Sequence, residues 1–355
     1  MVKTLNVQTA KPAVQALYGR AIKPNMYLIL TILGPLFVFA VFLLLAGANP
    51  LELYSTMIRS TFGDLYGFGE VVIKATPFIL TALAAGLPAK AGMINVGGEG
   101  QLVIGALFAT WVGVLYLNDV PGIIGLPLIF IAGALGGALW AGIAAVLKVK
   151  GRMNETITTL LLNYVAYFTV GYFVHGLLKD PESFNWPFSP ELAEPLRLPT
   201  FSSVSRVHIG IFIAIALAVL VWFVIAKTRV GFRIRVVGGN ILAAQRAGLN
   251  TGRTQFWVLV AAGSLAGIAG VIEITGIEGR LRATTGVNYG YLGFLASWMA
   301  WNHPLWLVGT AFVIGMISVA GNSLEISSGL PASSVQILMA LVLFAILAVG
   351  RRKQA

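Results

Sequence analysis

The segment KTRVGFRIRVVGGNILAAQRAGLNTGR, residues 227–253, is a basic loop that separates two long apolar runs. It contains one lysine, five arginines and no acidic residue. Basic loops between membrane spans stay in the cytoplasm, so this loop indicates the orientation of the chain. Its second half predicts a short helix that Asn240 caps and that Gly248 terminates at the C′ position. A loop of this kind is either a topological marker only or also a surface that receives a soluble partner.

The composition is that of an integral membrane protein. Of 355 residues, 57% are hydrophobic and only 10% are charged, whereas soluble domains carry about 25% charged residues. The net charge of +11 comes from basic residues near span ends and termini, a pattern that indicates contact with anionic lipid and not with nucleic acid. Cysteine is absent, and His175, His208 and His303 are too far apart for metal-ligand spacing. No metal site is therefore expected.

Ten apolar segments meet or approach the 20 or so residues that a membrane span needs. They are residues 27–46, 75–91, 101–117, 123–147, 156–177, 209–226, 256–274, 290–301, 305–320 and 335–349. Ten spans place every dense basic cluster on one side of the membrane. The sequence therefore predicts an all-α polytopic membrane protein with about ten transmembrane helices and cytoplasmic N- and C-termini. Whether 75–117 and 275–320 contain full spans or broken helices stays open.

The predicted domain organisation is one transmembrane domain, residues 26–350, between cytoplasmic tails at 1–25 and 351–355. Residues 49–74 mix charged and apolar side chains, which predicts an interfacial amphipathic helix on the outer face. Residues 178–207 form the longest hydrophilic stretch and are also predicted to lie outside. A further outer-edge cluster, solvated or at an interface, is expected from four charged residues: Glu273, Glu278, Arg280 and Arg282. The glycines of the fourth span predict a helix-contact face: Gly133, Gly136, Gly137 and Gly142.

Two polar features interrupt the apolar spans. Residues 93–101 contain three glycines with Asn95 and Glu99, which indicates either a broken helix lining a solute path or a cytoplasmic turn. Asn163, followed by Tyr164, lies among leucines inside the fifth span, where it either bonds to another helix or contacts a solute. These four residues are the candidate substrate pathway.

The sequence contains no P-loop, no nucleophile elbow, no zinc-protease motif and no carboxylate pair flanking a pocket. No catalytic residue and no cofactor are therefore expected in this chain. An ATP-driven process would need its nucleotide and magnesium sites on another chain.

Four ordered motifs resemble the transmembrane permease family of bacterial ABC importers for nucleosides, simple sugars and branched-chain amino acids. They are KAGMINVGGEGQ at 90–101, NETITTLLLNY at 154–164, GFRIRVVGGNILAAQRAGLN at 231–250 and ASWMAWNHPLWLVGTAFVIG at 296–315. The resemblance extends from about residue 50 to 350. In the combination of its segments, the chain looks most like the nucleoside-type permeases, whose binding protein is a basic-membrane-protein lipoprotein.

The resemblance implies the transmembrane subunit of an ATP-driven importer in the bacterial inner membrane, translocating nucleosides, with purines the expected class. A ribose-like simple-sugar permease is the alternative. An ion-coupled secondary transporter is a further one, less favoured because the acids cluster at span ends and not at the midplane. The implied partners are an ABC ATPase that carries ATP and magnesium, a second permease subunit (unlike or identical), an extracytoplasmic substrate-binding lipoprotein or periplasmic protein, and membrane lipid.

The resemblance also changes the interpretation of the basic loop. In this family the corresponding segment docks into a groove of the ATPase, so residues 227–253 become a predicted coupling loop. The residues assigned to that coupling are Gly238, Asn240, Ala243, Ala244, Arg246, Ala247, Gly248 and Asn250.

Overall fold

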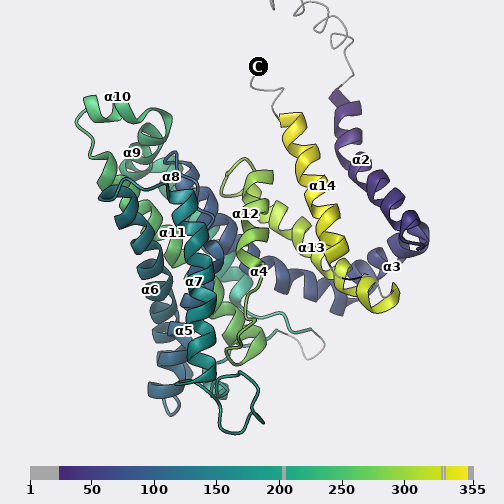
Figure 1. Cartoon of the computed structure of the whole chain (residues 1–355), viewed down its shortest axis with the longest axis horizontal. Helices are drawn as coiled ribbons and strands as arrows, with labels where there is room; N and C mark the ends of the chain where they lie inside the picture. Colours follow the sequence, from purple (N-terminus) through teal and green to yellow (C-terminus); the bar gives the residue numbers. More distant parts are fainter. Residues whose placement is uncertain (1–23, 202–204, 329–330, 332, 351–355) are drawn as a thin grey trace, which may run out of the picture. The chain divides into compact units, whose positions relative to one another are not determined.

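Helices dominate the described part of the chain, with only isolated β-bridges beside them (Figure 1). The computed structural model describes residues 24–201, 205–328, 331 and 333–350. Almost all of the expected N-terminal tail and the whole C-terminal tail lie outside these residues. The prediction of an all-α protein is confirmed.

The chain divides into two compact units. The first, Met1–Pro50 with Gln336–Ala355, contains α2 (Pro24–Leu45) and most of α14 (Ser333–Gly350). The second, Leu51–Val335, contains the other elements. They are α3 (Pro50–Phe62), α4 (Leu65–Ala89), α5 (Gly98–Tyr116), α6 (Gly122–Val149), α7 (Glu155–His175), η2 (Glu194–Leu196), α8 (Gly210–Lys227), α9 (Arg229–Gly239), α10 (Ile241–Arg246), α11 (Thr251–Glu273), η3 (Ile274–Glu278), α12 (Tyr289–Met299) and α13 (Trp306–Ser328).

Seven helices of the described residues are long and apolar enough to cross a membrane. They are α4, α5, α6, α7, α8, α11 continued by η3, and α13. An eighth span results only if residues 33–45 and 50–62 count as one broken span. The expected span 290–301 corresponds to α12, which has 11 residues; at about 1.5 Å per residue it is too short to cross a hydrocarbon core of about 30 Å. Multiple spans are therefore present, but the count of ten is not confirmed.

Helix α4 begins earlier than the sequence predicted. The Asp64 carboxylate accepts a hydrogen bond from the Gly67 amide at 2.6 Å and caps the helix at Leu65. The expected interfacial segment 49–74 therefore divides into α3 and the first turns of α4. Lys74 lies within this long helix, where its ammonium has the Tyr289 hydroxyl as a polar partner. Hydropathy alone could not reveal this partner.

Close helix contacts through glycine hold the second unit together. A Cβ added to Gly137 of α6 would lie 2.2 Å from the Gly263 carbonyl of α11. A Cβ at Gly267 would likewise lie 2.2 Å from the Gly133 carbonyl. Small residues let the two backbones approach this closely. The predicted helix-contact face of the fourth span is thus confirmed at Gly133 and Gly137.

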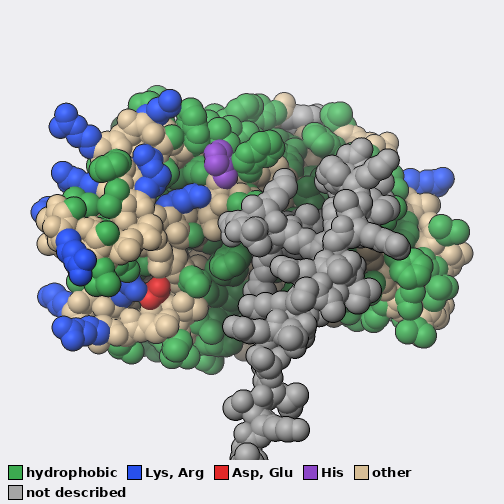
Figure 2. Space-filling view, turned by 90° about the horizontal axis from the view of Figure 1, so that it is seen from above, with side chains coloured by type: hydrophobic (Ala, Val, Ile, Leu, Met, Phe, Trp, Pro, Cys, Tyr) green, Lys and Arg blue, Asp and Glu red, His purple; other side chains and the backbone are tan. Residues whose placement is uncertain are grey.

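The second unit has two distinct ends. Helices α9 and α10 lie at one of them (Figure 1), which we call the basic end. Figure 2 looks onto this end and shows Lys and Arg side chains gathered where α9 and α10 lie. The opposite end carries the described parts of the long connection between α7 and α8, residues 176–201 and 205–209, and we call it the loop end.

Candidate functional site

The basic loop folds into two helices, not one. The Thr228 hydroxyl accepts from the Gly231 amide at 3.1 Å and starts α9, which the sequence did not predict. Asn240 Oδ1 then accepts from the Ala243 amide at 3.0 Å and starts α10. Gly248 follows α10 with φ of 78°, a left-handed conformation that favours glycine. Both predicted caps of the short helix are confirmed.

The two faces of α10 differ in exposure. Leu242 is 67% exposed, and Ala243, Arg246 and Ala247 are exposed as well. Ala244, in contrast, has no exposed surface and packs inside the chain. The expectation that Ala244 belongs to the docking surface is therefore corrected: in a helix this short, one alanine must face the chain that supports it.

Gly238 belongs to a contact within the chain. A Cβ at this position would lie 2.1 Å from the Lys90 carbonyl. On the other side of the contact, a Cβ at Gly92, where φ is 74°, would lie 3.4 Å from Gly238 Cα. The end of α9 therefore rests directly on the connection between α4 and α5. No side chain separates the two backbones at this contact.

The connection between α4 and α5 is held by Asn95, which is 1% exposed. Its Nδ2 donates to the Ala84 carbonyl at 3.0 Å, and its Oδ1 accepts from the Gly97 amide at 3.0 Å. Gln101 Nε2 also donates to Asn95 Oδ1 at 3.1 Å. The side chain thus fixes the non-helical turn before α5.

Glu99 caps α12, a helix almost 200 residues away in the sequence. Its carboxylate accepts from the Gly290 amide at 2.6 Å and from the Tyr291 amide at 3.4 Å. The Asn288 amide and the Tyr167 hydroxyl donate to it as well. A carboxylate at a helix N-terminus satisfies free amides and is favoured by the helix dipole. Glu99 therefore fixes the start of a short helix that does not span the membrane.

Asn163 of α7 joins the same cluster. Its Oδ1 accepts from the Gly100 amide at 2.9 Å, and its Nδ2 donates to the Val96 carbonyl at 3.0 Å and the Tyr291 hydroxyl at 3.2 Å. We call Asn95, Glu99 and Asn163 with these partners the polar node. All three side chains are 1% exposed. Tyr164, at 58% exposed, points away from the rest and has no place in the node.

A second polar cluster, in which Glu273 and Tyr289 are buried and Lys74 is half-buried, lies beside the start of α12. The sequence did not predict it. The Lys74 ammonium donates to the Tyr289 hydroxyl, which donates in turn to Glu273 Oε1 at 3.1 Å. Glu273 is 2% exposed, so of the two alternatives for this cluster, solvated or at an interface, the solvated one is wrong for Glu273. Its Oε2 is buried without a hydrogen-bond partner among the described residues. The signal in the sequence was the position of Lys74 directly before the apolar run 75–91, where a charge needs a partner.

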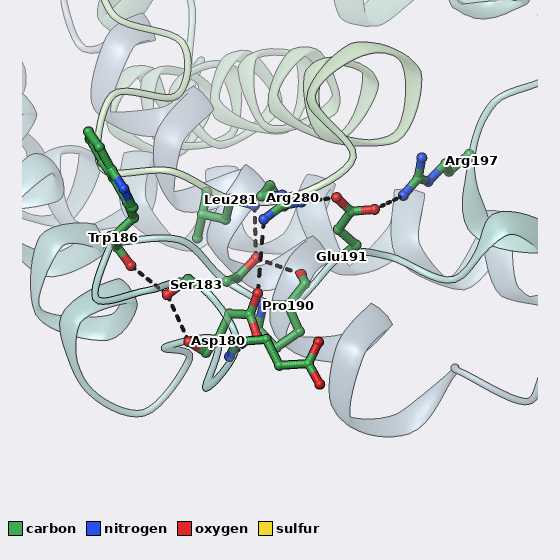
Figure 3. A network of polar contacts seen from close by, with 10 residues as sticks. Asp180, Ser183, Trp186, Pro190, Glu191, Arg197, Arg280 and Leu281 are labelled. Carbon is green, nitrogen blue, oxygen red and sulfur yellow. Dashed lines mark hydrogen bonds and ion pairs between the residues drawn. The ribbon is translucent and has the colours of Figure 1, made fainter.

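The loop end carries a surface network of ion pairs (Figure 3). Arg280 pairs with Glu191 and lies 3.9 Å from Asp180, while Arg197 pairs with Glu191 at 2.7 Å. The Leu281 amide donates to the Ser189 hydroxyl at 2.9 Å. The hydrophilic segment 178–207 is thereby joined to the connection that precedes α12.

His208 supports the loop end of α11. A Cβ at Gly210 or at Gly276 would lie 2.7 or 2.6 Å from its ring, so the imidazole fits between two glycines. Gly276 belongs to η3, a π-helical turn. Burial lowers the pKa of His208 to about 4, so the ring is neutral at physiological pH. Its role is packing against the π-turn.

The long apolar helices, with an exposed capped helix at a basic end, define a multi-pass membrane protein. The chain belongs to the family described as the branched-chain amino acid transport system permease component, whose model matches residues 67–347.

Three relatives illustrate the similarity. The chain is 35% identical to the glucose ABC transporter permease protein TsgB13 of Haloferax volcanii, over 89% of this chain and 85% of the relative. It is 33% identical to the guanosine ABC transporter permease protein NupP of Bacillus subtilis, over 86% of this chain and 87% of the relative. It is 28% identical to the nucleoside ABC transporter permease protein NupB of Lactococcus lactis, over 86% of this chain and 85% of the relative. No solved structure matches the chain significantly.

Proposed function

We propose that this chain is the transmembrane subunit of an ATP-driven importer that carries nucleosides, purines in particular, across a bacterial inner membrane. The observation that carries the solute class is the recurrence of guanosine and nucleoside permeases among the relatives. Two of these relatives, NupP and NupQ, come from Bacillus subtilis, and two others, NupB and NupC, come from Lactococcus lactis. A pair in each organism also supports assembly with a second, unlike permease.

The basic end is the cytoplasmic face in this proposal. The exposed face of α10, with Leu242 at its centre, inserts into a groove of a separate ATPase that holds ATP and magnesium. The loop end, with the network around Arg280 and Glu191, receives a substrate-binding lipoprotein. The chain contributes no catalytic residue.

A mechanical route follows from the contacts described above. Closure of the ATPase on ATP moves α10 and α9, and Gly238 transfers this movement to the backbone at Lys90 and Gly92. The polar node then carries it to the start of α12 through Glu99. Packed elements of this kind rearrange between discrete states and do not deform continuously. In this proposal Asn95, Glu99 and Asn163 shape the pathway by positioning α12.

A simple-sugar importer is the second candidate, favoured by the 35% identity to the glucose permease. The distinguishing experiment is uptake by the complete transporter, reconstituted with its ATPase, second permease and binding protein. We expect ATP-dependent uptake of labelled guanosine that unlabelled adenosine inhibits and that excess ribose or glucose does not. Uptake of a sugar without any uptake of nucleosides would overturn the nucleoside assignment.

Two alanines of the short helix and its C-cap, Ala244 and Ala247, separate docking from folding. We expect Ala247→Glu, at an exposed position, to leave the melting temperature of the purified chain unchanged. The same substitution should reduce solute-stimulated ATP hydrolysis at least tenfold, because it places an acid where the ATPase groove must close.

Ala244→Glu is the matched control. It buries an unpaired charge, which costs several kcal/mol, and should lower the melting temperature before any partner is added. Normal ATP hydrolysis and uptake by Ala247→Glu would contradict docking through this face.

A further inference from the structure

An apolar groove runs along the outside of the second unit between α6 and α11. Its volume is about 610 Å³, and every residue that lines it is apolar or glycine. Residues 135–147 of α6 form one wall, and Phe256, Trp257 and Val260 of α11 form the other. Within the most apolar stretch of α6, only 28% is buried inside the chain. Most of this stretch is therefore not covered by other helices of the chain. The groove therefore opens to the surroundings of the helix bundle.

The groove leads to two cations at the basic end. A Cβ at Gly252 would lie 3.1 Å from Val149 Cγ1, so the start of α11 touches the end of α6. Lys150 follows Val149 and lies one helical turn beyond Val146, which lines the groove. Arg253 lies one turn before Trp257, which also lines it. Residues four apart lie on the same face of a helix. Both walls thus continue toward a positive charge.

These two charges have no acidic partner among the described residues. Lys150 and Arg253 are exposed and take part in no ion pair there, whereas nearby Lys148 pairs with Glu155 at 2.6 Å. The segment 227–253, which ends at Arg253, contains no acid at all. Trp257 is 57% exposed beside the groove, and tryptophan prefers the boundary between the headgroups and the hydrocarbon. The arrangement matches an amphiphile with an anionic head.

We propose that this groove is a binding site for one anionic phospholipid. An acyl chain lies along α6 between Leu139 and Val146, and the headgroup phosphate lies between Lys150 and Arg253. Basic pockets between transmembrane helices recognise anionic headgroups in this way. The lipid braces the start of α11 just after Asn250, whose Oδ1 accepts from the Arg253 amide at 2.9 Å. The site rests on the multi-pass fold and does not depend on which solute is carried.

The test is native mass spectrometry and fluorescent-lipid titration of the purified full chain, with phosphatidylglycerol and phosphatidylcholine as probes. We expect one phosphatidylglycerol retained per chain and much weaker retention of phosphatidylcholine. Lys150→Gln with Arg253→Gln should weaken phosphatidylglycerol binding by about thirtyfold, because each cation near the surface contributes about a fivefold preference for anionic lipid. Lys227→Gln, an exposed lysine at the same end but on α8, is the matched control and should bind normally.

A second variant tests the acyl-chain part of the site. A Cβ at Gly142 would meet only Val260, at 3.9 Å, so Gly142→Phe can fill the groove while both cations stay in place. Loss of phosphatidylglycerol in this variant supports a lipid, and unchanged binding would indicate a site for phosphate alone. Equal retention of both lipids would overturn the proposal. Loss of the bound lipid on addition of the second permease would also overturn the proposal, because the groove would then be a protein interface.

Discussion

Replacing Glu99 by alanine is expected to abolish uptake and to destabilise the protein more than any other single change in the polar node. The carboxylate accepts from the amides of Gly290 and Tyr291 at 2.6 and 3.4 Å, and from the Asn288 amide and the Tyr167 hydroxyl. Its removal leaves the buried Gly290 amide without an acceptor, which costs about 1–3 kcal/mol. Three part-buried donors lose their partner as well, and the start of α12 loses its cap.

Two graded variants show whether Glu99 acts through α12. Glu99→Gln keeps the shape and one acceptor oxygen, so its melting temperature should fall between those of the wild type and Glu99→Ala. Tyr167→Phe removes one donor and leaves the amides of α12 capped, so it should cost only about 1 kcal/mol. Melting of the purified chain and guanosine uptake by the full transporter are the measurements. Wild-type melting together with lost uptake in Glu99→Ala would contradict a positioning role.

The second large effect concerns Lys74 and Glu273, which the Tyr289 hydroxyl connects inside the helix bundle. Lys74→Met leaves the buried Glu273 carboxylate without its cation. Lys74 is half-buried and reaches Glu273 through the Tyr289 hydroxyl. Loss of a hydrogen bond to a charged group costs about 1.5–3 kcal/mol. We therefore expect Lys74→Met to lower the melting temperature and to reduce uptake at least tenfold.

The double variant Lys74→Met with Glu273→Gln should recover most of that loss. Replacing both partners of a buried pair by neutral groups is often tolerated, because no uncompensated charge remains. A double-mutant cycle on melting temperature and uptake measures the coupling directly. Tyr289→Phe, which keeps the ring and removes the bridging hydroxyl, should give an intermediate loss. Additive losses in the double variant would show that the two charges do not act as a pair.

The short helix at the basic end could be predicted because its signals are local. Asn240 caps and Gly248 ends a helix through bonds to residues within a few positions, and both lie where the pattern indicates. The orientation of Ala244 toward the chain could not be predicted, because it depends on which face of α10 the rest of the chain covers. Helix α9 was missed although Gly231, Ile234 and Val237, three residues apart, form its buried face. The helix has only 11 residues, and its arginines were interpreted as part of a basic loop.

The buried polar residues show the same division. Asn95, Glu99 and Asn163 could be selected from the sequence because polar groups among apolar residues are costly unless they are bonded. Their partners could not be selected from the sequence. The amides that donate hydrogen bonds to Glu99 lie about 190 residues further along the chain. Lys74 was assigned to an interfacial segment because hydropathy counts its charge and cannot see the Tyr289 hydroxyl that receives it.

The sequence by itself determined that this is a helical, multi-pass membrane protein, and its motifs resemble one permease family. Composition and local motifs are enough for these conclusions, because burial in lipid and capping depend on neighbouring residues. Only the tertiary structure decided that α12 is too short to span the membrane and that Glu99 and Tyr289 hold its start. It also decided that Gly238 joins α9 to the connection before α5. These contacts link residues distant in the chain, and they depend on how the helices pack.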